Sequence, residues 1–289
     1  MGKSIKMILV NSFGGCATTM FTASLWRANF SNNKSVAPHL VWDDGRSGQG
    51  KNECRELKHT PYPPPSNTGR AHNGASAYWM SRRQGVTPPK QLEVIIEKAI
   101  YLYVDPLEAI LTFLGSDKGH ASIAGRGVPW PIGHAKNLGG DWSTFYEMVR
   151  ENYTDVFTEA DFSNHLFKVG HPFKGFPHHP SAIDIYASQN EDLFGLENHF
   201  DNWTNIKADY PILAIKYEAL WKAETLRKIS KFLDLQEIEY VNNFPPKKSR
   251  LRELTSLSPS AIKRLETIYQ SLTNKMKAKP SCTLNGEEY

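Results

Sequence analysis

The stretch Ile-Lys-Met-Ile-Leu-Val-Asn-Ser-Phe-Gly-Gly-Cys-Ala-Thr-Thr, residues 5–19, decides the fold. Residues 5–10 are almost all apolar, and a short apolar run before a turn is typical of a buried strand. Small residues follow, and residues 18–29 then carry apolar side chains at helical spacing. The sequence therefore predicts a strand, a small-residue loop and a helix in residues 5–29.

Strand and helix patterns alternate along the rest of the chain. The apolar residues 99–104 form the clearest further strand, and Asp105 and Pro106 follow as N-cap and first residue of a helix that we expect to end at Leu114. The remaining expected elements are strands at residues 39–42 and 211–217, helices at residues 192–203 and 220–233, and a last helix that Ser258 and Pro259 open. This alternation favours a three-layer α/β/α fold, with a central, mainly parallel sheet between helices.

Two long stretches lack this alternation. Residues 46–90 are rich in Pro and Gly, and residues 115–190 are rich in Gly, His, Pro and aromatic residues, with a short helix expected at 142–151. Loops of this length are uncommon in compact domains unless they serve a function. Since α/β folds of this size occur as one unit, we expect a single domain, residues 1–289, with both stretches as loop-rich insertions over the active site.

Composition narrows the class of protein. Of the 289 residues, 40% are hydrophobic and 22% charged, which excludes wholesale disorder, and the formal net charge is +4. That excess is too small to indicate a nucleic-acid partner, but it suits a small polyanionic ligand. The apolar run at residues 7–10 is far shorter than the ~20 residues of a membrane helix. Since no secretory leader precedes the first strand, we expect a cytoplasmic protein without a membrane partner, as a monomer or homodimer.

The loop after the first strand is suited to an anion. Backbone N–H groups at a helix start and the helix dipole both favour negative charge, and the small residues let a ligand approach the backbone closely. A tight strand-to-helix turn without a ligand is the alternative. The loop lacks the Gly-Lys-Ser/Thr ending of nucleotide triphosphatases and the Gly-x-Gly-x-x-Gly of dinucleotide-binding folds. Three cysteines without zinc-ligand spacing predict no metal.

Three segments of the chain, taken in order, carry a family resemblance. Residues 12–19 look like a 5′-phosphosulfate loop, commonly Pro-Lys/Arg-Ser-Gly-Thr-Thr. Residues 103–106 with Thr112 look like a 3′-phosphate segment, Arg-x-Pro followed by Ser, and residues 212–235 look like a hydrophobic-Tyr-Glu-x-Leu strand followed by a helix. The ordered set resembles the sulfotransferases that use 3′-phosphoadenosine 5′-phosphosulfate (PAPS). The resemblance covers most of the chain and implies a P-loop NTPase-like fold with PAPS as co-substrate.

The resemblance also implies which residues bind the donor. The loop would hold the 5′ side through backbone N–H groups and hydroxyls, Thr112 would contact the 3′-phosphate, and Tyr217 would contact adenine or simply end a strand. A basic stretch after residue 246 would reach the 3′-phosphate, or form a solvated face. The loop residues are Gly14, Gly15, Cys16, Ala17, Thr18 and Thr19, and the basic stretch is Lys247, Lys248, Ser249 and Arg250.

Three positions depart from the family pattern. Gly15 stands where the Lys or Arg facing the sulfonate is usual, Val104 stands where the Arg on the 3′-phosphate is usual, and Met20 replaces a frequent aromatic residue. We expect replacement cations from the stretch 247–250 and from Arg46, Lys51, Arg55 and Lys58. A degenerate member that binds weakly or does not catalyse remains an alternative.

A general base is expected just ahead of the Pro-rich run. Lys58-His59-Thr60-Pro61 resembles the family's Lys-Thr-His segment, with Lys and His adjacent here. His59 is accordingly the expected base and Lys58 a sulfonate contact, because sulfuryl transfer needs a group that takes the acceptor's proton. A surface role for His59 is the plain alternative, and Glu53, Glu56 and His72 are reserves.

The sequence thus predicts a sulfotransferase that moves the sulfuryl group of PAPS to a hydroxyl or amine of a small metabolite. Asp43 and Asp44 follow the predicted strand at 39–42 and would suit a cationic acceptor. Two alternatives stay open. One is a kinase-like phosphotransferase, and the other is a non-catalytic or nucleotide-binding protein on the same fold.

Overall fold

The computed structural model describes residues 4–16, 18, 21, 60–72, 92–114, 129–155, 157–163, 181–234 and 257–289. The chain divides into two compact units. A sheet unit holds residues 1–103, 201–247 and 280–289, and a helical unit holds residues 104–200 and 248–279. The prediction of one domain with two insertions stays a prediction. Residues 115–190, which were expected to be rich in loops, contain four of the helices that the structure describes.

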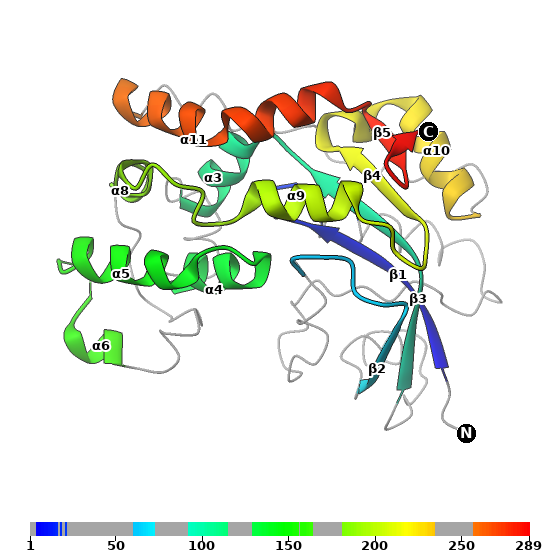
Figure 1. The fold of residues 1–289 in the computed structure, drawn as a ribbon, viewed down its shortest axis with the longest axis horizontal. Coiled ribbons are helices and arrows are strands. Elements are labelled where there is room, and N and C mark those ends of the chain that lie inside the picture. Colours follow the sequence, from blue (N-terminus) through cyan, green and yellow to red (C-terminus); the bar gives the residue numbers. More distant parts are fainter. Residues whose placement is uncertain are drawn as a thin grey trace. The chain divides into compact units, whose positions relative to one another are not determined.

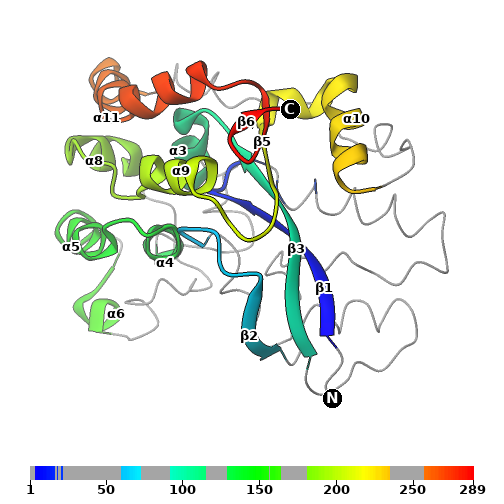
Figure 2. The ribbon, with the colours of Figure 1, turned by 45° about the vertical axis from the view of Figure 1, so that its right-hand side comes forward.

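Three parallel strands form the centre of the sheet unit (Figures 1 and 2). They are β1 (Ser4–Ser12), β3 (Leu92–Tyr103) and β4 (Ile212–Lys216). β3 lies between β1 and β4, and its second half, from Ala99 to Tyr103, is fully buried. The predicted strands at 5–10, 99–104 and 211–217 are therefore confirmed. Strands buried on both sides need the unbroken apolar runs that these segments carry.

Three antiparallel strands complete the sheet, so the prediction of a mainly parallel sheet is wrong: the sheet is mixed. β2 (Asn67–His72) pairs with the first half of β3, and β5 (Cys282–Leu284) with β6 (Glu287–Glu288) extends the sheet beyond β4. β2 also lies inside the stretch 46–90 that was predicted to be loop. Its sequence lacks an apolar pattern, and the strand is defined by its pairing with the long β3.

The helical unit draws its helices from two stretches of the chain (Figure 1). Its members are α3 (Pro106–Leu114), α4 (Pro129–Leu138), α5 (Trp142–Asn152), α6 (Glu159–Ser163), α8 (Ala182–Ser188) and α11 (Pro259–Ala278). Aromatic rings fill its core, with Phe194 within 4.8–5.3 Å of the ring centroids of Phe113, Phe145 and Tyr186. Every residue of α3 is buried, so this helix is central to the unit.

Helix starts in this unit follow their sequence signals. The Asp105 carboxylate accepts from the Leu107 N–H at 2.9 Å, and Ser258 Oγ accepts from the Ala261 N–H at 3.1 Å. Both caps and their following prolines were predicted, as was the helix at 142–151. In the sheet unit the predicted helix 220–233 is split into the 3₁₀ turn η2 (Tyr217–Trp221) and α10 (Ala223–Phe232). The helix expected at 192–203 is α9 (Leu196–Asn205).

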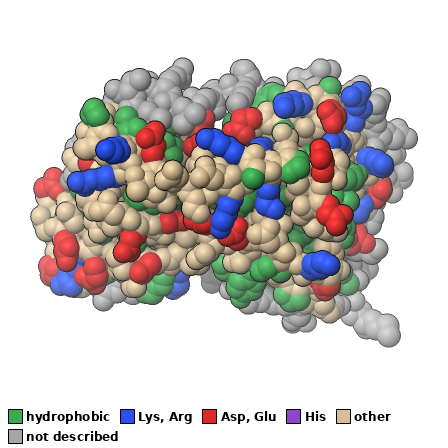
Figure 3. Space-filling model, turned by 45° about the horizontal axis from the view of Figure 1, so that its top comes forward, with side chains coloured by type: hydrophobic (Ala, Val, Ile, Leu, Met, Phe, Trp, Pro, Cys, Tyr) green, Lys and Arg blue, Asp and Glu red, His purple; other side chains and the backbone are tan. Residues whose placement is uncertain are grey.

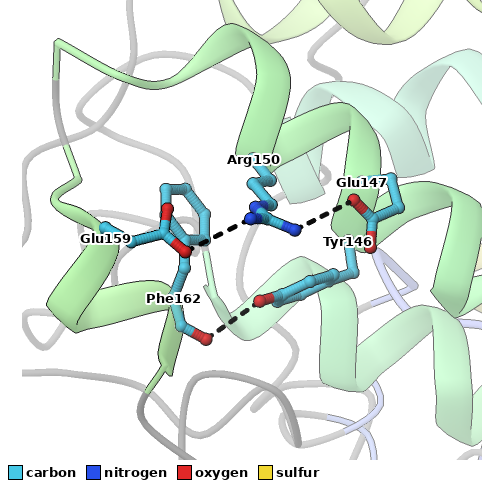
Figure 4. Close-up of polar contacts among 5 residues, drawn as sticks. All are labelled: Tyr146, Glu147, Arg150, Glu159 and Phe162. Atoms are coloured by element: carbon cyan, nitrogen blue, oxygen red, sulfur yellow. Dashed lines mark hydrogen bonds and ion pairs between the residues drawn. The ribbon is translucent and has the colours of Figure 1, made fainter.

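The short helix α6 is tied to α5 by two side chains (Figure 4). Arg150 reaches from α5 to Glu159 at 3.2 Å and lies 3.9 Å from Glu147 on its own helix. The Tyr146 hydroxyl donates to the Phe162 carbonyl at 2.9 Å. A helix of one turn has little stability of its own, so these contacts and the buried Phe162 ring hold it in place.

Two glycines bring backbones into direct contact in the helical unit. A Cβ on Gly140, between α4 and α5, would lie 2.5 Å from the Phe194 carbonyl carbon. Gly195 faces it with a φ of +68°, and its Cβ would lie 2.9 Å from the Gly140 Cα. The loop before α9 can therefore pack on the α4–α5 turn only if both positions lack side chains.

Charges alternate over the face drawn in Figure 3, where Lys and Arg side chains of the described residues stand among Asp and Glu side chains. This matches the near balance of the two signs in the sequence. Among the helices that the structure describes, none has the length and apolar character needed to cross a lipid bilayer.

Candidate functional site

The loop after β1 turns sharply on two glycines. Gly14 has a φ of 102° and Gly15 a φ of 74°, conformations that residues with a side chain rarely adopt. Two successive glycines with positive φ turn the chain back immediately after the strand, and Gly15 stays partly exposed. The small residues seen in the sequence are therefore required by the backbone of this loop.

Hydroxyl groups hold the turn from inside. Ser12 Oγ lies 2.7 Å from Thr18 Oγ1 and accepts from the Gly14 N–H at 3.1 Å. Ser12 is fully buried, whereas Thr18 is partly exposed. The hydroxyl of Ser12, at the end of β1, and the hydroxyl of Thr18 therefore lie side by side at this loop.

Two side chains of the loop point into the protein rather than toward solvent. Phe13 and Cys16 are completely buried, and Cys16 Sγ lies 3.0 Å from the Gly14 carbonyl and 3.5 Å from the Leu102 carbonyl. Cys16 therefore fixes the loop to the end of β3. Because the Cys16 side chain is buried, Cys16 would contact a ligand only through its backbone.

Thr60 is hydrogen-bonded to Asn11, the residue before Ser12. The Asn11 carboxamide donates from Nδ2 to both the Thr60 carbonyl at 3.3 Å and Thr60 Oγ1 at 3.2 Å. The same carboxamide accepts from the Ser12 N–H at 2.7 Å. Trp203 Nε1 also donates to the Thr60 carbonyl at 2.9 Å, and the indole stacks on Tyr101 with centroids 5.5 Å apart.

The whole Pro-rich run that follows Thr60 is anchored in the same way. The Pro61 carbonyl accepts from Asn202 at 3.0 Å, and the Pro64 carbonyl accepts from the Tyr210 hydroxyl at 2.8 Å. Ser66 donates through its N–H and hydroxyl to Asp209, and the hydroxyl bond is the main cause of a lowered pKa of that carboxyl. Since proline offers no N–H, the run is held almost entirely through its carbonyl groups.

The register of the parallel strands brings two predicted parts to one edge. Ser12 pairs with Leu102, and Leu102 pairs with Ile215, so these residues form one row across the sheet. Tyr217 follows β4 directly and is therefore at the same edge as the glycine turn, two strands away, which is ~10 Å. Its ring is buried and packs edge-on against Trp221 at 4.8 Å.

Lys216, the last residue of β4, is a cation at this edge. The side chain is partly buried, and burial lowers the pKa of its ammonium group, with Glu218 acting in the opposite direction. Ionisable groups with perturbed pKa values are frequent in functional sites. The sequence analysis did not consider Lys216.

Thr112 belongs to the helical unit. It is buried within α3, and its hydroxyl donates to the Glu108 carbonyl at 2.8 Å, which leaves only its oxygen lone pairs for other partners. Asp105, at the start of α3, has a raised pKa because burial outweighs the bond from the Leu107 N–H. Val104, which replaces the usual arginine, is fully buried.

Several predicted site residues lie outside the described residues. These are Ala17, Thr19, Lys58, His59, Lys247, Lys248, Ser249 and Arg250, together with Asp43 and Asp44. Their assignments stay predictions. His59 is nevertheless linked by one peptide bond to Thr60, whose contacts to Asn11 are described above.

His72, a reserve for the base, is at the wrong end of the sheet. It pairs with Leu92 at the start of β3, whereas Ser12 pairs with Leu102. At about 3.3 Å per residue, ten residues of strand separate the two positions by ~30 Å. The backbone register therefore excludes His72 as a base acting at the β1 loop.

Sequence reasoning did not predict the contacts that join Asn11, Thr60 and Trp203. Asn11 carried a weak signal, as the first polar residue after a buried strand. No local pattern could have joined Thr60 to Asn11 or to Trp203, because these contacts span 49 and 143 positions of sequence.

Within the described ranges, no cluster of three or more His, Cys, Asp or Glu side chains is arranged to hold a metal ion. Comparison with family models, with curated proteins and with solved structures finds no match to this chain.

Proposed function

We propose that the chain is a sulfotransferase that moves the sulfuryl group of PAPS to a hydroxyl or amine of a small metabolite. The observation that carries this proposal is the β1 loop, a turn on Gly14 and Gly15 with the hydroxyls of Ser12 and Thr18 beside it. Backbone N–H groups and hydroxyls gathered at the carboxyl end of a parallel strand favour an anionic group such as a phosphosulfate.

The chemistry asks mainly for positioning and for charge stabilisation. The acceptor oxygen or nitrogen attacks sulfur in line, the bond from sulfur to the 5′-phosphate oxygen breaks, and adenosine 3′,5′-bisphosphate leaves. His59 would take the acceptor's proton, and Lys58 would neutralise the sulfonate. The hydrogen bonds from Asn11 and Trp203 to Thr60 support this assignment, because they hold the residue next to His59 beside the loop.

Adenine and the 3′-phosphate need further contacts. Tyr217 at the same sheet edge suits the adenine side, and Thr112 with residues 247–250 would hold the 3′-phosphate. The P-loop NTPase-like fold, with helices on both faces of the sheet, is supported by β1, β3 and β4, which are adjacent and parallel. A cytoplasmic location and a small acceptor, with a positive charge if Asp43 and Asp44 face it, complete the proposal.

Binding of adenosine 3′,5′-bisphosphate tests the proposal directly. At about a hundred times its Kd, this nucleotide should add ~2.7 kcal/mol to the free energy of unfolding, seen as a raised melting temperature in magnesium-free buffer. Transfer of labelled sulfur from PAPS to a panel of small alcohols and amines would then establish the reaction.

Two other results would point to the alternatives. Stabilisation by ATP with magnesium, and none by adenosine 3′,5′-bisphosphate, selects a kinase-like phosphotransferase. Stabilisation by adenosine 3′,5′-bisphosphate without transfer to any acceptor selects a non-catalytic nucleotide-binding protein. No stabilisation by either nucleotide would overturn the reading of the β1 loop as an anion site.

A further inference from the structure

Thr60 is held more firmly than a connecting segment requires. Its carbonyl accepts two hydrogen bonds, from Asn11 Nδ2 and from Trp203 Nε1, and its hydroxyl oxygen accepts a third from Asn11. The two carbonyl bonds alone would fasten the main chain to the sheet. The third bond fixes the orientation of the side chain, which a structural anchor does not need.

The Asn11 carboxamide links Thr60 to the glycine turn. Asn11 is almost completely buried, and its oxygen accepts from the Ser12 N–H at 2.7 Å while its nitrogen donates to Thr60. One carboxamide group therefore separates the Thr60 hydroxyl from the first N–H of the loop. The described bonds occupy both ends of this carboxamide.

The Thr60 hydroxyl can still donate a hydrogen bond to a ligand. A hydroxyl has one donor and two acceptor positions. Within the part of the chain that the structure describes, Thr60 Oγ1 takes part only as the acceptor of the Asn11 bond. The residue is partly exposed. Asn11 thus occupies one lone pair and leaves the O–H to point elsewhere.

We infer that Thr60 is a further ligand-binding residue of the β1 loop, which donates its hydroxyl proton to the 5′-phosphate or sulfonate oxygens of the donor. This inference rests on the proposed function. Asn11 acts as a positioning residue, since it orients Thr60 through Nδ2 and the loop through Oδ1. The glycine turn lacks the usual lysine or arginine, so an oriented neutral donor supplies part of the missing stabilisation.

The test compares variants of Thr60 against two nucleotides. Adenosine 3′,5′-bisphosphate has the 5′-phosphate, and adenosine 3′-monophosphate lacks it. Thr60→Val removes the hydroxyl and keeps the shape, while Thr60→Ser keeps the hydroxyl. Ser66→Ala is the matched control, because it removes a hydroxyl that bonds to Asp209 from the other end of the same anchored run.

Loss of a hydrogen bond to a charged oxygen should weaken binding of adenosine 3′,5′-bisphosphate to Thr60→Val about tenfold or more. Thr60→Ser and Ser66→Ala should bind it within about threefold of the wild type, and adenosine 3′-monophosphate should bind all four proteins equally. Should the valine variant not fold, Thr60→Ala takes its place in the same comparison.

The results distinguish failure of the Thr60 inference from failure of the proposed function. Equal binding of adenosine 3′,5′-bisphosphate to wild type and Thr60→Val overturns the inference and leaves the proposed function intact. An equal loss for both nucleotides assigns Thr60 a structural role and also overturns it. No binding of either nucleotide by the wild type removes the proposed function and the inference with it.

Discussion

The β1 loop of the sheet unit and the start of α9 in the helical unit both bury polar groups, but they satisfy them differently. At the β1 loop, buried Ser12 bonds to Thr18, which is partly exposed, and the turn itself is made by glycines. Before α9, the Asp192 carboxylate accepts from the Tyr269 hydroxyl at 3.0 Å and from the Glu197 N–H at 3.1 Å.

The Tyr269 hydroxyl that donates to Asp192 also bonds to the hydroxyl of Tyr186. The hydroxyls of Tyr186 and Tyr269 are 2.6 Å apart, and both rings are fully buried. Burial raises the pKa of each phenol well above its ordinary value, so both stay neutral. Since Tyr269 donates its proton to Asp192, Tyr186 donates to Tyr269. This chain of bonds ends inside aromatic packing, which suits stability rather than ligand binding.

The difference teaches where chemistry is to be sought in this chain. Polar groups at a strand end, held by partly exposed partners, can exchange those partners for a ligand. The hydroxyls of Tyr186 and Tyr269, whose rings are fully buried, cannot do so without loss of packing. Changes at the first region should therefore alter binding and turnover, and changes at the second should alter stability and its dependence on pH.

The largest expected effect is on turnover. His59→Ala should lower sulfuryl transfer about 10²–10⁴-fold if His59 is the base, while the melting temperature stays near that of the wild type. Release of adenosine 3′,5′-bisphosphate from PAPS in the presence of a small alcohol or amine measures it.

His72→Ala is the matched control for this change. The strand register separates His72 from the loop by ~30 Å, so turnover should remain close to the wild type. Near-normal turnover of His59→Ala would remove His59 as the base. A loss of equal size in both variants would mean that neither acts through proton transfer at the loop.

The next largest effect is on stability, at the contact between the α4–α5 turn and the loop before α9. Gly140→Ala should lower the free energy of unfolding by about 3 kcal/mol or more, since its Cβ would overlap the Phe194 backbone. Urea denaturation followed by circular dichroism measures it. Gly139→Ala tests only the cost of a positive φ, 80° here, at an exposed position and should cost ~1 kcal/mol. Equal costs would contradict the described contact.

The sequence predicted the parts of the fold that depend on local patterns. β1, β3 and β4 are apolar runs, and the caps at Asp105 and Ser258 are single-residue signals. The β5–β6 hairpin was missed although its turn, Asn285-Gly286, is a standard hairpin signal, with φ values of 51° and 88°. The strands beside it are too short to form an apolar pattern, so the sheet was expected to be mainly parallel.

The candidate site likewise has parts that local sequence predicts and parts that depend on contacts between distant segments. Gly14 and Gly15 could be found from the sequence, because a small-residue loop after a strand has a local meaning. The contacts of Thr60 with Asn11 and Trp203 could not, because they join segments far apart in the chain. The position of His72 likewise depends on β2 pairing with β3, which no apolar pattern announced.

The smallest expected effect is a dependence of stability on pH that comes from Asp192. Burial raises the pKa of this carboxyl to about 6, against the lowering by the Glu197 N–H and the Tyr269 hydroxyl. The folded chain therefore holds a proton on Asp192 between about pH 4 and pH 6, where the unfolded chain, with an ordinary pKa of ~3.9, has lost it. Stability from this group is complete below about pH 4 and is lost as the pH rises through 6.

Asp192→Asn isolates this contribution from that of the other carboxyls. A shift of about two pKa units corresponds to at most ~3 kcal/mol, and less is expected because the side chain is partly accessible to water. The wild type should lose about 1–2 kcal/mol more than Asp192→Asn between pH 4 and pH 7, measured by urea denaturation at each pH. Parallel pH profiles of the two proteins would place the Asp192 carboxylate in water. The enclosed network of the helical unit would then be no more closed than the β1 loop.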